Sequence, residues 1–135
     1  MQLNPYLNFN GQCKEAFEFY AQCLGGKITR MLTYADTPMK DHVPAGTAVK
    51  IVHARLVVGE EVLMGSDAME KYETPQGFSV TINVEDTAEA ERVFAALAEG
   101  GNMGMPIQET FWAKRFGIVV DRFGTPWMVN CEKVP

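Results

Sequence analysis

The stretch Ile118-Val-Val-Asp-Arg-Phe-Gly-Thr-Pro-Trp-Met-Val-Asn130 has the pattern of a β-hairpin. A β-branched run precedes a turn over residues 121–124, and an apolar strand follows from about Trp127. Gly124 suits the positive φ of such a turn, and Pro126 lies at a strand start, where no ladder donor is needed. The stretch therefore predicts two paired strands, and not a helix, in the last quarter of the sequence.

The residues just before this hairpin concentrate aromatic and charged side chains. They run Glu109-Thr-Phe-Trp-Ala-Lys-Arg-Phe-Gly117, so one tryptophan, Trp112, lies here and the other, Trp127, lies in the hairpin. Aromatic side chains are mostly core residues, which favours a hairpin that closes a hydrophobic core. Two indoles beside Glu109 and a basic pair also fit the mouth of an apolar pocket with a few polar groups. The sequence leaves both interpretations open.

Outward from the hairpin, the chain shows one pattern twice. A strand with alternating side chains is followed by an amphipathic helix and then by a Gly-Gly pair that ends the helix. These segments are residues 6–10, 12–24 and 25–26 in the first half, and 78–84, 87–99 and 100–101 in the second. The repetition indicates an internal duplication.

Three more strand-like segments follow each Gly-Gly pair. They cover residues 27–34, 49–58 and 62–64 in the first half, and 105–111, 116–120 and 127–129 in the second. The order is therefore βαβββ twice, and the glycines between and within the strands would help each sheet to curl. We predict an α+β fold with a single domain over residues 1–135, made of two modules of about 1–70 and 76–135.

Composition restricts the class of protein. The 135 residues are 47% hydrophobic and 21% charged, which is typical of a globular domain. The net charge of −5 and the lack of a basic stripe argue against a nucleic-acid partner. No segment has the length of a membrane span, and the first residues lack the pattern of a secretory signal. Cys13, Cys23 and Cys131 show no CxxC spacing, so we expect free thiols and a cytoplasmic location.

Four motifs resemble one known branch of proteins. They are Asn4-Pro-Tyr-Leu-Asn-Phe-Asn10, Met64-Gly-Ser-Asp-Ala68, Gln108-Glu-Thr-Phe-Trp-Ala113 and Asp121-Arg-Phe-Gly-Thr-Pro-Trp-Met-Val-Asn130. Together with the duplication, they resemble the PhnB-like branch of the vicinal-oxygen-chelate superfamily, which includes glyoxalases, extradiol dioxygenases and bleomycin-resistance proteins. That branch is sometimes labelled a 3-demethylubiquinone methyltransferase domain. The resemblance implies two βαβββ modules whose mixed sheets curl around one cleft, and a homodimer.

Enzymes of the superfamily hold a divalent metal with His, Gln or Glu on the first and last strands of each module. In this chain the first-strand positions fall at about Tyr6 and Ser79. The last-strand positions fall at Leu63 or Met64 and at Met128. None of these side chains is a usual ligand for such metals. We therefore predict that the ancestral metal site is absent and that the protein uses no cofactor.

The predicted site is a pocket for a small organic ligand. Tyr6 and Asn8 share one face of their strand, and Met128 is expected to point inward with its neighbour Trp127 on the opposite face. Met and Trp side chains would favour flat or apolar ligands. The predicted ligand-binding residues are Tyr6, Asn8, Met64, Phe111, Trp112, Trp127 and Met128.

Two further residues are candidates for acid–base chemistry. His53 lies within a strand, as a hydrogen-bonded sheet histidine or as a ligand or proton shuttle. Glu109, near two indoles, is either a general acid or base or the ion-pair partner of Lys114 or Arg115. The alternative function is thus a metal-dependent lyase, isomerase or dioxygenase. A methyltransferase is not supported, because the glycine-rich stretch of residues 100–104 follows a helix instead of preceding one.

Overall fold

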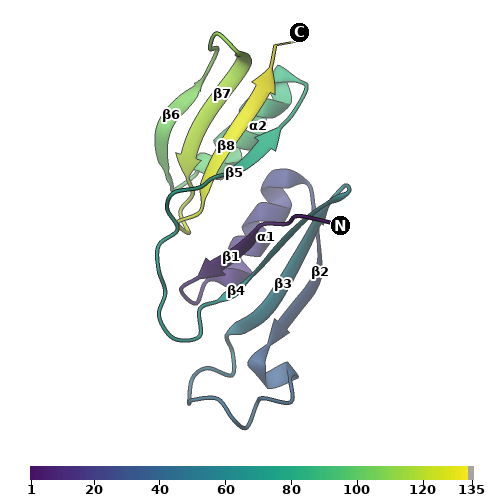
Figure 1. Ribbon diagram of the computed structural model, residues 1–135, viewed down its shortest axis with the longest axis vertical. Helices are drawn as coiled ribbons and strands as arrows, with labels where there is room; N and C mark the ends of the chain where they lie inside the picture. The colour runs from purple at the N-terminus through teal and green to yellow at the C-terminus, as the bar shows by residue number, and fades with distance from the viewer. Residues whose placement is uncertain (134–135) are drawn as a thin grey trace. The chain divides into compact units, whose positions relative to one another are not determined.

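The computed structural model describes residues 1–133, and it divides into two compact units that meet in sequence at Glu73 and Thr74. Each unit has the order βαβββ and forms a mixed four-stranded sheet with one helix on one of its faces (Figure 1). The predicted α+β fold, with eight strands and helices near residues 12–24 and 87–99, is confirmed.

In the first unit, the element order is β1 (Tyr6–Phe9), α1 (Cys13–Leu24), β2 (Lys27–Thr33), a short 3-10 helix η1 (Tyr34–Asp36), β3 (Ile51–Val58) and β4 (Glu61–Asp67). The sheet has the strand order β1-β4-β3-β2. β1 pairs in parallel with β4, whereas the other neighbours are antiparallel. After β1, the chain crosses one face of the sheet as α1 and then joins the opposite edge as β2.

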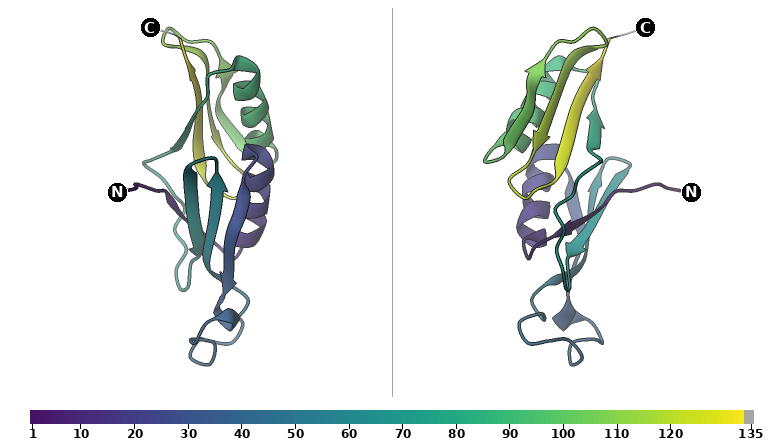
Figure 2. Two further views of the ribbon diagram at one scale, coloured as in Figure 1. Left: turned by 90° about the vertical axis from the view of Figure 1, so that its right-hand side faces the viewer. Right: turned by 60° about the vertical axis from the view of Figure 1, so that its left-hand side comes forward.

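The second unit repeats this arrangement. Its elements are β5 (Val80–Asn83), α2 (Thr87–Ala98), β6 (Asn102–Gln108), β7 (Ala113–Val120) and β8 (Pro126–Glu132). The strand order is β5-β8-β7-β6, with β5 and β8 parallel. Helix α2 runs along one face of this sheet, as Figure 2 shows from two sides. Pro126 is the first residue of β8, as the sequence predicts.

One strand lies elsewhere than predicted. β6 ends at Gln108, so residues 109–112 form the connection to β7 instead of the end of a strand. Thr110 closes this connection, because its N–H donates to Ala113 O and its Oγ1 accepts from Ala113 N, both at 3.0 Å. The shift places the predicted site residues Glu109, Phe111 and Trp112 on a loop.

Each helix packs an aromatic ring onto a glycine of its sheet. A Cβ added at Gly65 would lie 2.8 Å from Cε1 of Phe17, and one added at Gly117 would lie 2.5 Å from Cε1 of Phe94. Both phenylalanines are almost completely buried. These glycines are therefore required for close approach of the helix, since any other side chain would displace the ring.

The N-terminus of each helix is held by a carboxylate. Asp67, which is buried, accepts from the N–H groups of Cys13 and Ile51, at 2.9 and 2.8 Å. Burial, and then the charge of Asp67, raises the pKa of the Cys13 thiol far above its ordinary value. Asp86 caps α2 by accepting from Glu89 N at 3.2 Å. Asp67 and Cys13 thus have a structural role in the first unit.

All three cysteines are free and buried. Among residues 1–133, no helix is long and apolar enough to cross a membrane.

Candidate functional site

In each unit, one face of the sheet lies away from the helix, and we call it the distal face of that unit. Side chains alternate along a strand, so the residues between those that contact the helix belong to the distal face. Gly65 contacts Phe17 of α1, and Gly117 contacts Phe94 of α2. The first distal face therefore includes Tyr6, Asn8, His53, Arg55, Met64 and Ser66, and the second includes Thr81, Asn83, Phe116, Ile118, Met128 and Asn130.

The first distal face brings four of the predicted site residues together. Tyr6 lies directly opposite Met64, and its ring stacks on that of His53 with centroids 6.1 Å apart. Asn8 lies opposite Ser66, whose Oγ donates to Asn8 Oδ1 at 3.5 Å. Tyr6 is 46% exposed, and His53 and Met64 are half-buried. The face thus presents two stacked rings, a thioether and two polar groups.

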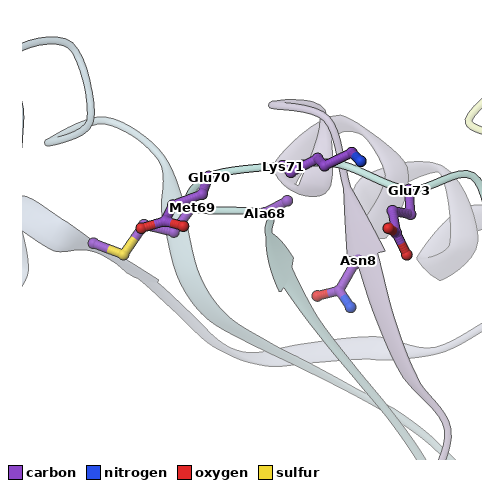
Figure 3. A pocket seen from close by; sticks show the side chains of 6 residues that line it. All are labelled: Asn8, Ala68, Met69, Glu70, Lys71 and Glu73. Carbon is purple, nitrogen blue, oxygen red and sulfur yellow. The ribbon is translucent and has the colours of Figure 1, made fainter.

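A pocket of about 520 Å³ lies beside Asn8, at the edge of this sheet. The segment that follows β4 forms the rest of its wall through Ala68, Met69, Glu70, Lys71 and Glu73. In Figure 3, Asn8 and Glu73 project on one side of the pocket, and Met69 and Glu70 lie on the other. Asn8 is the only predicted site residue in this lining, which otherwise mixes charges of both signs.

An aromatic cluster marks the second unit. Phe111 and Trp112 meet edge to face with centroids 4.8 Å apart, and Trp112 meets Phe116 in the same manner at 5.2 Å. Phe111 is 89% exposed and Trp112 is 42% exposed. Because Phe116 belongs to the second distal face, the cluster joins the loop after β6 to that face.

Next to Phe116 lies a pair of asparagines that was not among the predicted site residues. Asn130 is opposite Phe116 on β7 and opposite Asn83 on β5. Its Nδ2 donates to Asn83 Oδ1 at 3.1 Å. Asn130 is only 8% exposed, and its Oδ1 has no hydrogen-bond partner within residues 1–133. Asn130 is two residues from Met128 on the same strand, so alternation places both on the second distal face. This alternation is the sequence feature from which Asn130 could have been predicted.

The two adjacent residues Trp127 and Met128 lie on opposite faces, as the alternation predicts. Met128 is half-buried on the second distal face. Trp127 is 1% exposed, and its indole N–H donates to Asp121 Oδ2 at 2.7 Å. Trp127 therefore belongs to the core beneath α2 and offers no surface to a ligand.

Comparison with known proteins identifies the family. The model of the family described as 3-demethylubiquinone-9 3-methyltransferase matches residues 1–130. The chain belongs to this family. It is 34% identical to protein YjdN of Escherichia coli strain K12, over 98% of this chain and 97% of that protein.

Solved structures of similar proteins share this fold. The structure of protein PA1353 from Pseudomonas aeruginosa matches with a TM-score of 0.91 at 52% identity, covering 99% of each chain. The PhnB protein from Bacillus cereus, described as a putative 3-demethylubiquinone-9 3-methyltransferase, matches with a TM-score of 0.82 at 23% identity, over 97% of this chain and 99% of that chain. Matches at 13% identity or below, with TM-scores of 0.62 to 0.67, extend the fold to fosfomycin-resistance and glyoxalase/bleomycin-resistance/dioxygenase proteins.

In this PhnB-like chain, Glu109 is on the surface. Its carboxylate is 66% exposed and lies 3.1 Å from Lys133 Nζ. The predicted ion-pair partners, Lys114 and Arg115, are therefore wrong. Arg115 instead donates to Glu91 of α2 at 2.8 Å, and this hydrogen bond raises the pKa of its guanidinium. That the residues of the two units line one pocket stays a prediction.

Strand pairing also relates the positions that the sequence resemblance assigned to metal ligands. Tyr6 is opposite Met64, and in the second unit Thr81 is opposite Met128. The predicted position Ser79 is wrong by two residues, because β5 begins only at Val80. Two hydroxyls and two thioethers do not fit a divalent cation that prefers carboxylate and imidazole ligands. Within the described chain, no group of three or more His, Cys, Asp or Glu side chains could hold a metal ion.

Proposed function

We propose that this PhnB-like protein binds a small organic molecule on the second distal face, without a metal ion. The observation that carries the proposal is the exposed Trp112, which packs edge-on against Phe116 next to the unsatisfied amide of Asn130. A site with an aromatic wall and a few placed polar groups is the usual composition of a small-molecule site.

The aromatic cluster supplies apolar contact area. Phe111 and Trp112 expose large ring surfaces to water, and covering apolar surface contributes about 25 cal/mol per Å². A flat ligand can stack on the exposed part of Trp112 while Met128 and Ile118, both half-buried, contact its edge. The cluster therefore favours an aromatic or otherwise planar ligand.

The asparagine pair can orient the ligand. A buried amide oxygen without a partner is unfavourable, by about 1–3 kcal/mol for such a group. An N–H or O–H group of the ligand, or a water that the ligand replaces, would satisfy Asn130 Oδ1. We therefore infer that the ligand carries a hydrogen-bond donor next to its planar part.

The proposal that no metal ion takes part rests on the side chains at the expected ligand positions. Tyr6, Met64, Thr81 and Met128 stand where the superfamily has its ligands, and none is a carboxylate or an imidazole. The alternative is a metal-dependent lyase, isomerase or dioxygenase that uses His53 and Glu109. Metal analysis of the purified protein separates the two, because stoichiometric, tightly held Ni, Zn, Mn or Fe would overturn the proposal.

The chain lacks the sequence features of a methyltransferase site. A nucleotide-type site typically needs a glycine-rich turn between a parallel strand and a helix. Here β1 is joined to α1 by Asn10, Gly11 and Gln12, with one glycine, and the sheet is mixed. The three free, buried thiols support a cytoplasmic location.

A ligand library measured by thermal shift tests the proposal, since a ligand that binds the folded state raises the melting temperature. We expect planar compounds with an N–H or O–H donor to stabilise the protein. Trp112→Ala should abolish the shift, whereas Phe78→Ala, which removes another exposed ring outside the cluster, should retain it. Equal shifts in both variants, or no stabilising compound at all, would overturn the site.

A further inference from the structure

Two arginines face each other on the first distal face. Arg30 of β2 lies directly opposite Arg55 of β3, and the row continues through Met64 to Tyr6. Arg30 is exposed and Arg55 is half-buried. Neither guanidinium has an ion pair or a hydrogen bond to any residue between 1 and 133. Like charges directly opposite each other destabilise a sheet, so this pair is not there for stability.

A β-bulge is what brings Arg30 to this face. The register shifts between Ile28 and Arg30, so that Thr29 is the extra residue. Without the bulge, Arg30 would pair with Ala54, which is fully buried on the side of α1. Bulges commonly re-aim a side chain near a functional site. The bulge therefore places a second cation beside Arg55 that the regular alternation would have directed elsewhere.

The second unit shows that the fold does not need these arginines. It has the same bulge in β6, between Met103 and Met105, and Met105 then lies opposite Ile118. The row continues to Met128 and Thr81, just as the first row continues to Met64 and Tyr6. An apolar pair thus occupies the positions that correspond to the two arginines. The internal duplication gives a natural comparison in which only the first unit carries charge there.

The charges around the pair have one sign. Lys27 lies opposite Val57, two residues along β3 from Arg55. None of the strand residues on the first distal face is a carboxylate, although the chain has a net charge of −5. The acidic residues Glu70 and Glu73 line the pocket beside Asn8, on the opposite edge strand β1. Arg30 and Arg55 therefore form a local cationic site in an acidic protein.

We propose that the first distal face binds the acidic group of a small organic anion, a carboxylate or a phosphate, through Arg30 and Arg55. Guanidinium groups match the geometry of both anions with paired hydrogen bonds. The stacked rings of Tyr6 and His53, on the same face, provide a flat surface for the organic part of the molecule. This site lies wholly in the first unit and does not depend on the ligand site proposed for the second unit.

The probes are inorganic phosphate and benzoate, titrated at constant ionic strength against the isotope-labelled protein. We expect saturable NMR shifts of the Nε–Hε signals of Arg30 and Arg55 with both anions. Benzoate should bind more tightly than acetate, because its ring can stack on Tyr6. Higher salt should weaken the binding of each anion.

The second unit supplies the test variant, Arg30→Met with Arg55→Ile. It should fold with an unchanged or higher melting temperature, since it removes the repulsion of two like charges. Its affinity for both anions should fall by about tenfold or more, the effect of losing a charge-assisted hydrogen bond. Arg55→Lys keeps the charge but loses the paired geometry, and should show an intermediate loss.

Two controls separate the possible failures. Lys40→Met removes one exposed charge elsewhere and should leave anion binding unchanged. Phe78→Ala, which removes an exposed ring outside both proposed sites, should also leave it unchanged. Non-saturating shifts shared by all surface arginines, or equal affinities in the double variant and the native protein, would overturn the proposal.

Discussion

Trp127 donates its indole N–H to Asp121 Oδ2, with 2.7 Å between nitrogen and oxygen, in the core of the second unit. The other carboxylate oxygen, Oδ1, accepts from the N–H groups of Phe123 and Thr125, at 2.8 and 3.1 Å. Asp121 is 3% exposed. One buried carboxylate therefore ties the hairpin turn to the tryptophan that packs beneath α2.

We expect Asp121→Asn to lower the free energy of unfolding by about 1–3 kcal/mol. Asparagine has one acceptor oxygen and one NH₂ group, so whichever way it is turned, a donor faces a donor. Urea unfolding followed by tryptophan fluorescence measures the change. Asp86→Asn is the matched control, because Asp86 is an exposed helix cap and asparagine caps equally well. Equal effects of the two substitutions would contradict this role of Asp121.

The fold could be predicted because its signals are local. Strands with alternating side chains, helices with apolar residues at helical spacing and Gly-Gly pairs recur in both halves. The hairpin turn of residues 121–124 is indicated by Gly124. The exception was β6, where two register shifts, at Met103/Met105 and Met105/Gln108, interrupt the alternation. A bulge interrupts the two-residue alternation of side chains from which a strand is predicted.

For the candidate site residues, the sheet face could be predicted only where alternation alone decides it. Tyr6 and Asn8 follow from the period of β1, and His53 joins them through the pairing of β3 with β4. Arg30 could not be predicted, because a regular strand from Lys27 would turn it toward α1. The asparagine pair depends on strand pairing between residues far apart in sequence, which one sequence does not reveal.

The buried Cys13 thiol gives a pH prediction. Its pKa is raised in the folded state, so as the pH rises the unfolded chain releases this proton first. The unfolded state then binds fewer protons than the folded state, and the free energy of unfolding falls above about pH 8.5. Below that pH the contribution of the neutral thiol is fully present.

Cys13→Ala should make this fall less steep, by up to about 1.4 kcal/mol per pH unit. The measurement is urea unfolding of both proteins at a series of pH values from 7 to about 10. Parallel curves for the two proteins would show that Cys13 does not contribute to the alkaline loss of stability.

We predict a homodimer from the sheet edges. Each four-stranded sheet has two edge strands, which are β1 and β2 in the first unit and β5 and β6 in the second. Unpaired edges invite association, and β6 also carries Met103, which is 58% exposed. Light scattering over a dilution series should give twice the 15.0 kDa of one chain at micromolar concentration. A mass of 15.0 kDa throughout would refute the dimer.

The last prediction decides what Glu109 does. Its ion pair with Lys133 is exposed, and such pairs contribute about 0–1 kcal/mol to stability. Glu109→Gln and Lys133→Gln both break the pair, so each should leave the melting temperature within a few degrees of the native value. Glu109 lies in the same loop as Phe111 and Trp112, and we expect its carboxylate to contact the ligand of the second distal face. Glu109→Gln alone should then change ligand affinity. If both substitutions leave ligand binding equally unchanged, or if Glu109→Gln unfolds the protein, Glu109 is only the ion-pair partner of Lys133.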